Sequence, residues 1–186
     1  MKFENYLSYF EDILANPSKF PTYADPEYLN YAKLNWSRMN RWLKKFEPTE
    51  DAKEFFATLK ERQTWILITE PWCGDAAHSV PQIYNLVKDN SNITVDIQLR
   101  DAEPFLIDKY LTDGSKSIPK LIIRNESGSD IAIWGPRPEA LQQLFLEMKE
   151  EGKALEEIKE YFQKWYNEDK GIELQHELIT LLKSRS

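Results

Sequence analysis

The sequence predicts an α/β fold flanked by helical segments at both ends of the chain. The middle of the 186-residue chain alternates between short apolar runs, as in buried strands, and stretches in which apolar residues have helical spacing. The first and last parts of the chain carry helical spacing alone. Hydrophobic residues make up 41% of the sequence and charged residues 30%, a mix typical of a globular rather than a disordered protein.

The first 46 residues have the pattern of two helices. Apolar residues recur at intervals of three and four until Asn16-Pro17 ends the first pattern. Pro26 suits the first turn of a second helix, and Thr49 suits the N-cap of a third. The first two helices are rich in aromatic residues, which must be buried. The sequence leaves open whether they pack on the rest of the chain or on a second copy in a homodimer.

Four strands are expected in the middle of the chain, at residues 64–69, 93–99, 119–124 and 130–134. The first is a nearly continuous apolar run, as in a strand buried on both faces. The first two strands are linked through a helix and should be parallel, whereas the last two should form an antiparallel hairpin. We therefore expect a central mixed sheet of about four strands. A short helix is expected at residues 103–111.

Three further helices are expected towards the C-terminus, the first of them after Gly135-Pro-Arg-Pro138. We therefore divide the chain into a helical N-terminal extension at residues 1–47, an α/β domain at residues 48–150, and a helical C-terminal extension at residues 151–186 packed on the core.

Charge and hydropathy exclude several classes of function. Acidic residues outnumber basic ones 31 to 24, and the net charge of −7 disfavours binding to nucleic acid or anionic membranes. No apolar run approaches the roughly 20 residues of a membrane-spanning helix, and no signal peptide is recognisable, so we expect a cytoplasmic protein. We interpret the basic cluster of Arg38, Arg41, Lys44 and Lys45 as a solvated face rather than a nucleic-acid contact. Nothing marks a metal or cofactor site.

Cys73 is the single cysteine of the sequence, which excludes an internal disulfide and a metal site built from cysteines alone. It lies where a buried strand becomes a helix, and a helix N-terminus favours the reactive thiolate. Gly74 permits a tight turn, so we expect an accessible sulfur. Asp75 opposes a thiolate because its charge has the same sign. A buried cysteine acting as a small apolar residue is the alternative.

His78 points away from Cys73 along the helix, so we expect a packing or surface role for it.

Two segments carry a resemblance to a known family. Glu70-Pro-Trp-Cys-Gly74 with its following helix, and Ser117-Ile-Pro119 before a hairpin strand, resemble the thioredoxin superfamily over roughly residues 50–146. Trp-Cys-Gly-Asp and Trp-Gly-Pro-Arg-Pro resemble the thioredoxin-like proteins of Bacteroidetes. The resemblance implies a thioredoxin-like fold with Cys73 as the nucleophile and a cis peptide bond before Pro119 facing it. It assigns to the substrate groove Trp72, Gly74, Asp75, Ile118, Pro119, Gly135, Pro136 and Arg137.

The sequence also departs from the redox pattern of this family. The second cysteine of Cys-x-x-Cys, which resolves a mixed disulfide, is replaced by Ala76, and the position of the family's buried acid holds Leu67. These changes exclude an ordinary dithiol reductase. One function left open is a monothiol thiol–disulfide oxidoreductase, in which Cys73 attacks a protein or low-molecular-weight disulfide and an external thiol completes the cycle. The other is a binding or adaptor protein that uses the groove without turnover.

Overall fold

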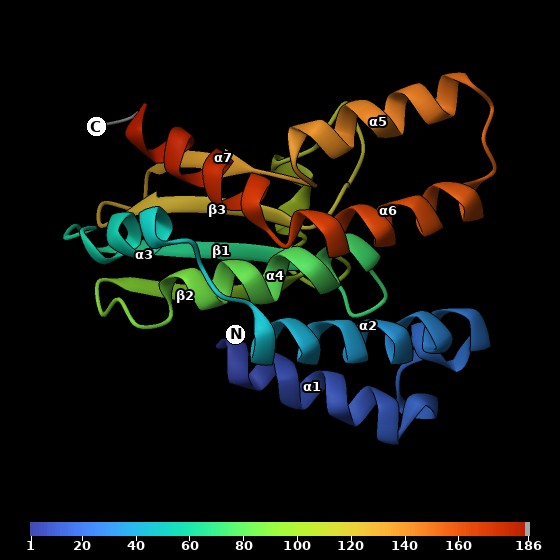
Figure 1. Cartoon of the computed structure of the whole chain (residues 1–186). Coiled ribbons are helices and arrows are strands. Elements are labelled where there is room, and N and C mark those ends of the chain that lie inside the picture. The colour runs from blue at the N-terminus through green and yellow to red at the C-terminus, as the bar shows by residue number, and fades with distance from the viewer. Residues whose placement is uncertain (185–186) are drawn as a thin grey trace.

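The structure is a computed structural model that describes residues 1–184; the last two residues of the expected C-terminal extension lie outside the described residues. Within the described chain, a four-stranded sheet is surrounded by α-helices (Figure 1). The strands are β1 (Gln63–Thr69), β2 (Ile93–Leu99), β3 (Lys120–Asn125) and β4 (Asp130–Trp134). The helices are α1 (Phe3–Ala15), α2 (Pro26–Lys45), α3 (Glu50–Ala57), α4 (Gly74–Val87), α5 (Glu139–Glu150), α6 (Leu155–Asp169) and α7 (Ile172–Lys183).

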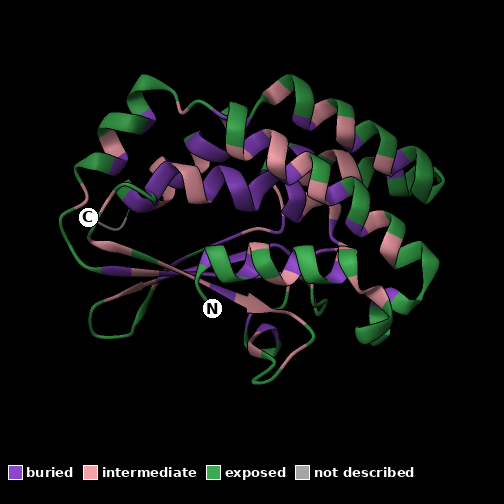
Figure 2. Ribbon diagram, turned by 90° about the horizontal axis from the view of Figure 1, so that it is seen from below, coloured by how far each residue is buried: buried purple, intermediate pink, exposed green. Residues whose placement is uncertain are grey.

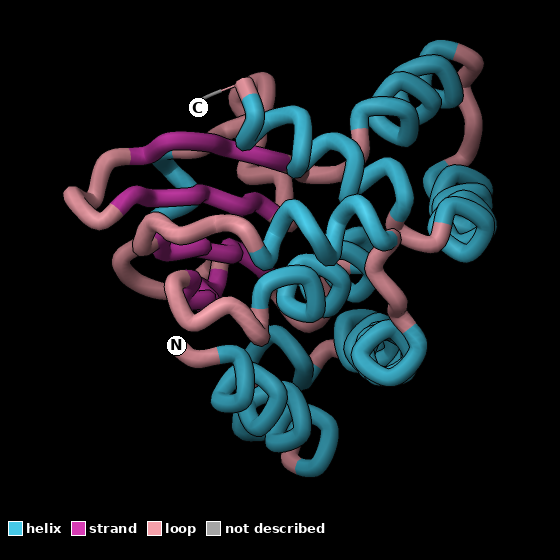
Figure 3. The backbone as a smooth tube through the Cα atoms, turned by 60° about the vertical axis from the view of Figure 1, so that its left-hand side comes forward, coloured by secondary structure: helices cyan, strands magenta, loops and turns pink. Residues whose placement is uncertain are grey.

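The strand order in the sheet is β2-β1-β3-β4. β1 is parallel to β2 and antiparallel to β3, and β4 is antiparallel to β3. The strands form one layer, and most of the helices lie together on one side of it (Figure 3). The predicted fold class, a mixed four-stranded sheet with helices at both ends of the chain, is confirmed. β1 lies between β2 and β3, and six of its seven residues are buried, which agrees with its continuous apolar run.

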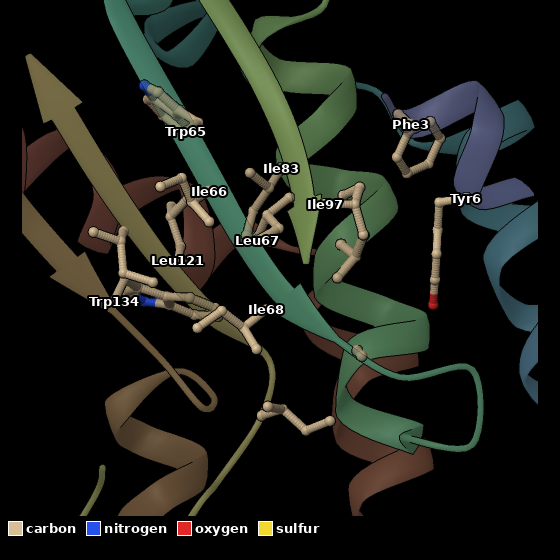
Figure 4. Packing of buried hydrophobic residues seen from close by; sticks show 14 of the residues in the cluster. Phe3, Tyr6, Trp65, Ile66, Leu67, Ile68, Ile83, Ile97, Leu121 and Trp134 are labelled. Carbon is tan, nitrogen blue, oxygen red and sulfur yellow. The ribbon is translucent and has the colours of Figure 1, made fainter. Parts of the chain in front are cut away.

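The main core is centred on β1 and includes side chains from the N-terminal helices. Trp65, Leu67 and Ile68 of β1 have no exposed surface, and Phe3 and Tyr6 of α1 are 2% and 0% exposed (Figure 4). Burying one such side chain contributes about 1.5–3 kcal/mol. The N-terminal aromatic residues are therefore packed largely within their own chain. A homodimer through these helices stays a prediction.

Local signals in the sequence set the ends of the N-terminal helices. Pro26 is the first residue of α2, and the Asp25 side chain caps this helix by accepting a hydrogen bond from the backbone N–H of Glu27 at 2.8 Å. Thr49 caps α3 as expected, because its hydroxyl accepts from the backbone N–H of Ala52 at 3.3 Å. Each cap satisfies a backbone donor that the helix itself leaves unpaired.

The helix expected at residues 103–111 is wrong. The structure has only a short 3₁₀ helix at Leu106–Lys109. Phe105 has a φ of 52°, in the left-handed region, and a right-handed helix cannot continue through such a residue. The apolar spacing in this segment reflects single contacts with the core, such as that of the fully buried Ile107, rather than one face of a helix.

The C-terminal helices are buried in two different places. Leu174, Leu178 and Leu182 of α7 belong to the main core. A second apolar cluster lies between α5 and α6 and consists of Leu141, Met148, Ile158, Phe162 and Tyr166. α4 is more deeply enclosed than these helices: every residue from Ala76 to Ile83 is buried, whereas the outer helices expose one face (Figure 2). Among residues 1–184, no helix combines the length and apolarity needed to cross a membrane.

Candidate functional site

Cys73 lies after the end of β1, at the N-cap position of α4. Its Sγ donates a hydrogen bond to the backbone carbonyl of Ile118 at 3.3 Å. The Ile118-Pro119 peptide bond is cis, which confirms the prediction for this bond. The thiol therefore faces the backbone immediately before Pro119, as the resemblance implied.

The expectation of an accessible sulfur is wrong. Cys73 is only 8% exposed, and burial raises the pKa of its thiol to about 12, with the charge of Asp75 adding to the increase. The backbone N–H groups of Ala76 and Asp75 and the charge of Arg137 lower this pKa by less. Full burial can shift a pKa by several units, whereas a helix terminus contributes about 0.3–1 kcal/mol, so desolvation exceeds the effect of the helix.

Asp75 is held by two partners from distant parts of the chain. Arg137 donates to Asp75 Oδ2 from Nε at 3.0 Å and from Nη2 at 2.7 Å, and both side chains are little exposed. The hydroxyl of Tyr166, on α6, donates to Asp75 Oδ1 at 2.9 Å. The guanidinium of Arg137 also lies 5.1 Å from the ring of Phe162. This network ties the start of α4 to the C-terminal helices.

His78 has a packing role, as expected. Its Nδ1 accepts a hydrogen bond from Trp42 Nε1 at 2.9 Å, and its Nε2 lies 3.0 Å from Gln163 Oε1. The ring stacks on Tyr166 with centroids 4.2 Å apart. Burial lowers the pKa of His78 to about 3, so the imidazole is neutral, with Nδ1 as acceptor and Nε2–H as donor. Both nitrogens are therefore bonded to residues other than Cys73.

A groove with a volume of about 650 Å³ is lined by residues of α2, of α6 and of the start of α4. Of the predicted site residues, Trp72, Cys73, Gly74, Asp75 and Arg137 line it.

The remaining predicted site residues, Ile118, Pro119, Gly135 and Pro136, do not line this groove. Ile118, Pro119 and Pro136 are buried. Gly135 packs directly against Pro119: its φ is 105°, and a Cβ here would lie 2.4 Å from the carbonyl oxygen of Pro119. The turn at Gly135 thus covers the backbone beside Cys73. A substrate-binding role for these four residues stays a prediction.

Sequence reasoning missed the side walls of the groove. They include Tyr28, Leu34 and Arg38 from α2 and Leu155 and Phe162 from α6. The available signal is the aromatic-rich second helix, for which the sequence predicts packing on the rest of the chain or on a second copy.

The interpretation of the basic cluster as a solvated face is wrong for two of its members. Arg38 is half-buried and lines the groove. Arg41 is also half-buried, and it donates from Nη2 to Asn167 Oδ1 at 2.6 Å. Lys44 and Lys45 are exposed as expected.

A second buried acid lies near the site. Glu70, at the end of β1, is 6% exposed, and burial raises the pKa of its carboxyl to about 7. Its Oε1 accepts from the backbone N–H of Asp101 at 2.9 Å.

Leu67 and Ala76, at the family positions of the buried acid and the resolving cysteine, are 0% and 1% exposed. Within residues 1–184, no group of three His, Cys, Asp or Glu side chains could hold a metal ion.

Comparisons with known proteins agree with this geometry. The sequence model of the family described as Thioredoxin matches residues 24–153, more than half of the chain. None of the curated proteins matches the sequence. Among solved structures, the fold is similar to that of a protein of unknown function from Pseudomonas aeruginosa, with a TM-score of 0.58, 14% identity, and coverage of 82% of this chain and 86% of the other. It is also similar to an HIV epitope-scaffold, with a TM-score of 0.61, 13% identity, and coverage of 84% and 92%.

Proposed function

Because this chain belongs to the thioredoxin family, we propose that it keeps the family's fold and cysteine position to bind a ligand in the groove, without turnover of disulfides. The observation that carries the proposal is the burial of Cys73, whose thiol pKa is raised to about 12. Only a minute fraction of such a thiol is ionised at neutral pH, and the thiolate is the nucleophile in disulfide exchange. The thiol thus serves as part of the groove floor.

Two further features support binding rather than catalysis. Ala76 provides no resolving thiol, and Leu67 provides no proton-handling group on β1. The Trp72–Asp75 motif without a resolving cysteine is the one that resembles the Bacteroidetes-type group. A cytoplasmic location fits this reading, because thiols there stay reduced and a single cysteine needs no disulfide partner.

A monothiol thiol–disulfide oxidoreductase is the second candidate. It is favoured by the position of Cys73, which lines the groove while its Sγ faces the carbonyl of Ile118. In this reaction the Cys73 thiolate attacks a protein or low-molecular-weight disulfide, forming a mixed disulfide and releasing one thiolate. An external thiol then attacks the mixed disulfide and releases Cys73.

Mixed-disulfide formation separates the two functions. The protein is exposed to oxidised glutathione for timed intervals and analysed by intact-protein mass spectrometry, with Cys73→Ser as the blank. We expect the adduct to form more slowly than with N-acetylcysteine. Faster formation, followed by sustained insulin reduction when reduced glutathione is supplied, would establish the monothiol enzyme instead.

A further inference from the structure

Arg38 is the cation of the groove that lacks an acidic partner. Arg137 is paired with Asp75 at 2.7 Å, and Lys159 is paired with Glu156 at 2.7 Å. Arg38 donates only to the amide oxygen of Asn35, at 2.8 Å, and within the described residues no carboxylate lies within 4 Å of its guanidinium. An unpaired, half-buried guanidinium leaves several donors available to a ligand.

The structure holds this guanidinium at a fixed place. Asn35 is 1% exposed, and its Nδ2 donates to the backbone carbonyl of Pro71 at 3.0 Å, which fixes the oxygen that Arg38 bonds. A Cβ built on Gly74 would lie 4.0 Å from Arg38 Nη1, so the guanidinium lies beside the first residue of α4. Arg38 is therefore positioned on the wall of the groove near Cys73, rather than extending into solvent.

The surroundings of Arg38 in the groove are apolar. Leu34 of α2 is 46% exposed and Leu155 of α6 is 60% exposed, and the buried Ile158 and Phe162 also line the groove. Tyr28 is also 40% exposed along the same groove. The volume of about 650 Å³ lies within the range of small-molecule sites. Exposed apolar side chains gathered along one groove are typical of an interaction or ligand site.

Apart from Asp75, which is paired with Arg137, the acidic residues that line the groove are exposed. Glu27, Glu156 and Glu160 are all exposed, whereas Arg38 is half-buried. Exposed charges are screened by water and salt, and a half-buried one is screened much less. Because Arg137 compensates the charge of Asp75, the charge that remains inside the groove is the positive charge of Arg38.

From these observations we propose that the groove binds a small amphiphilic anion, with its carboxylate on Arg38 and its apolar part between Leu34 and Leu155. The inference rests on the proposed function, in which this groove is a ligand site, and it adds the chemical class of the ligand. A carboxylate fits the planar guanidinium with two parallel hydrogen bonds, which gives the ligand one orientation.

Isothermal titration calorimetry with decanoate, and with the uncharged decan-1-ol, tests the proposal. Arg38→Gln removes the charge, and Lys33→Gln, an exposed change on the same helix, is the matched control. We expect Arg38→Gln to weaken decanoate binding about tenfold or more and to leave decan-1-ol binding unchanged, whereas Lys33→Gln changes neither. Equal affinity of wild type and Arg38→Gln for decanoate would overturn the assignment of the head group.

A second pair of variants covers the case in which Arg38→Gln fails to fold. Leu34→Glu and Leu34→Gln alter an exposed wall residue and differ only in charge. We expect decanoate, but not decan-1-ol, to bind the Glu variant several-fold more weakly than the Gln variant. Equal decanoate binding by the two would overturn the proposal. Binding of a Leu- and Glu-containing decapeptide without binding of decanoate would also overturn it, while leaving the proposed binding function standing.

Discussion

Replacing Tyr166 with phenylalanine removes a hydroxyl that connects α6 to the start of α4. The Tyr166 side chain is 2% exposed, and its hydroxyl donates to Asp75 Oδ1 at 2.9 Å. Asp75 keeps both hydrogen bonds from Arg137 in the variant, so its charge stays compensated. The substitution therefore isolates one charge-assisted hydrogen bond without opening a large cavity.

The expected loss of stability follows from the burial of both partners. A hydrogen bond to a charged group contributes about 1.5–3 kcal/mol net, and a buried acceptor left unpaired costs about as much. We expect Tyr166→Phe to lower the free energy of unfolding by about 2 kcal/mol. For a chain of this length, that corresponds to a decrease in Tm of about 4–8 °C.

Urea unfolding followed by circular dichroism measures this loss, with Tyr161→Phe as the matched control. Tyr161 is on the same helix, but it is 45% exposed, and removal of its hydroxyl should change stability by less than about 0.5 kcal/mol. If the two variants unfold at the same urea concentration, the bond to Asp75 does not hold α6 against the site, and the reasoning fails.

Three further predictions concern groups around the same site. Asp75→Asn should lower the thiol pKa of Cys73 from about 12 but leave it above the free value of roughly 8.5, because burial is the larger cause of the raised pKa. The pH dependence of iodoacetamide alkylation measures the thiol pKa of the variant, and a value below roughly 8.5 would contradict this prediction. The pKa of Glu70 is about 7 in the folded state and about 4.3 in the unfolded state. Between these two pH values the folded state binds more protons than the unfolded state, so the stability of the protein should fall as the pH rises from about 4.3 to 7. Glu70→Gln should flatten that dependence in urea unfolding at pH 4.5, 6 and 8, and an unchanged slope would exclude this carboxyl as its source. In thermal unfolding, Gly135→Ala should lower the stability of the protein far more than Gly128→Ala. Both glycines have positive φ, but only a Cβ at Gly135 meets a backbone carbonyl oxygen, at 2.4 Å. Equal losses of stability in the two variants would show that the backbone moves to accommodate the Cβ at residue 135.

The fold could be predicted from the sequence because its signals are local. The apolar run of β1, the hairpin turn at residues 125–129 and the caps at Asp25 and Thr49 are each short segments whose chemistry favours one conformation. The exception, at residues 103–111, depends on the left-handed φ of Phe105. Nothing in the residues around Phe105 marks that conformation, because residues other than glycine rarely adopt it.

The state of the site could not be predicted, because it depends on contacts between distant segments. The helix N-terminus at Cys73 was visible in the sequence, but the burial that raises its pKa comes from packing. Asp75 and Tyr166 are 91 residues apart, and no sequence spacing relates them. Arg38 has the same local pattern as the exposed Lys44 and Lys45, and only the position of α6 makes it a groove residue.

The proposed binding function has a structural basis in the two helices that flank the groove. α2 and α6 lie over the start of α4, and each contributes a wall of the groove as well as a buried contact to the Cys73 region, through Asn35 and Tyr166. The same enclosure that removes water from the sulfur raises its pKa and creates a largely apolar space beside Arg38, which has no acidic partner among residues 1–184. Shortening α6 to expose the thiol would therefore also remove the wall that holds a ligand, so thiol reactivity and groove binding should change in opposite directions across variants of this helix.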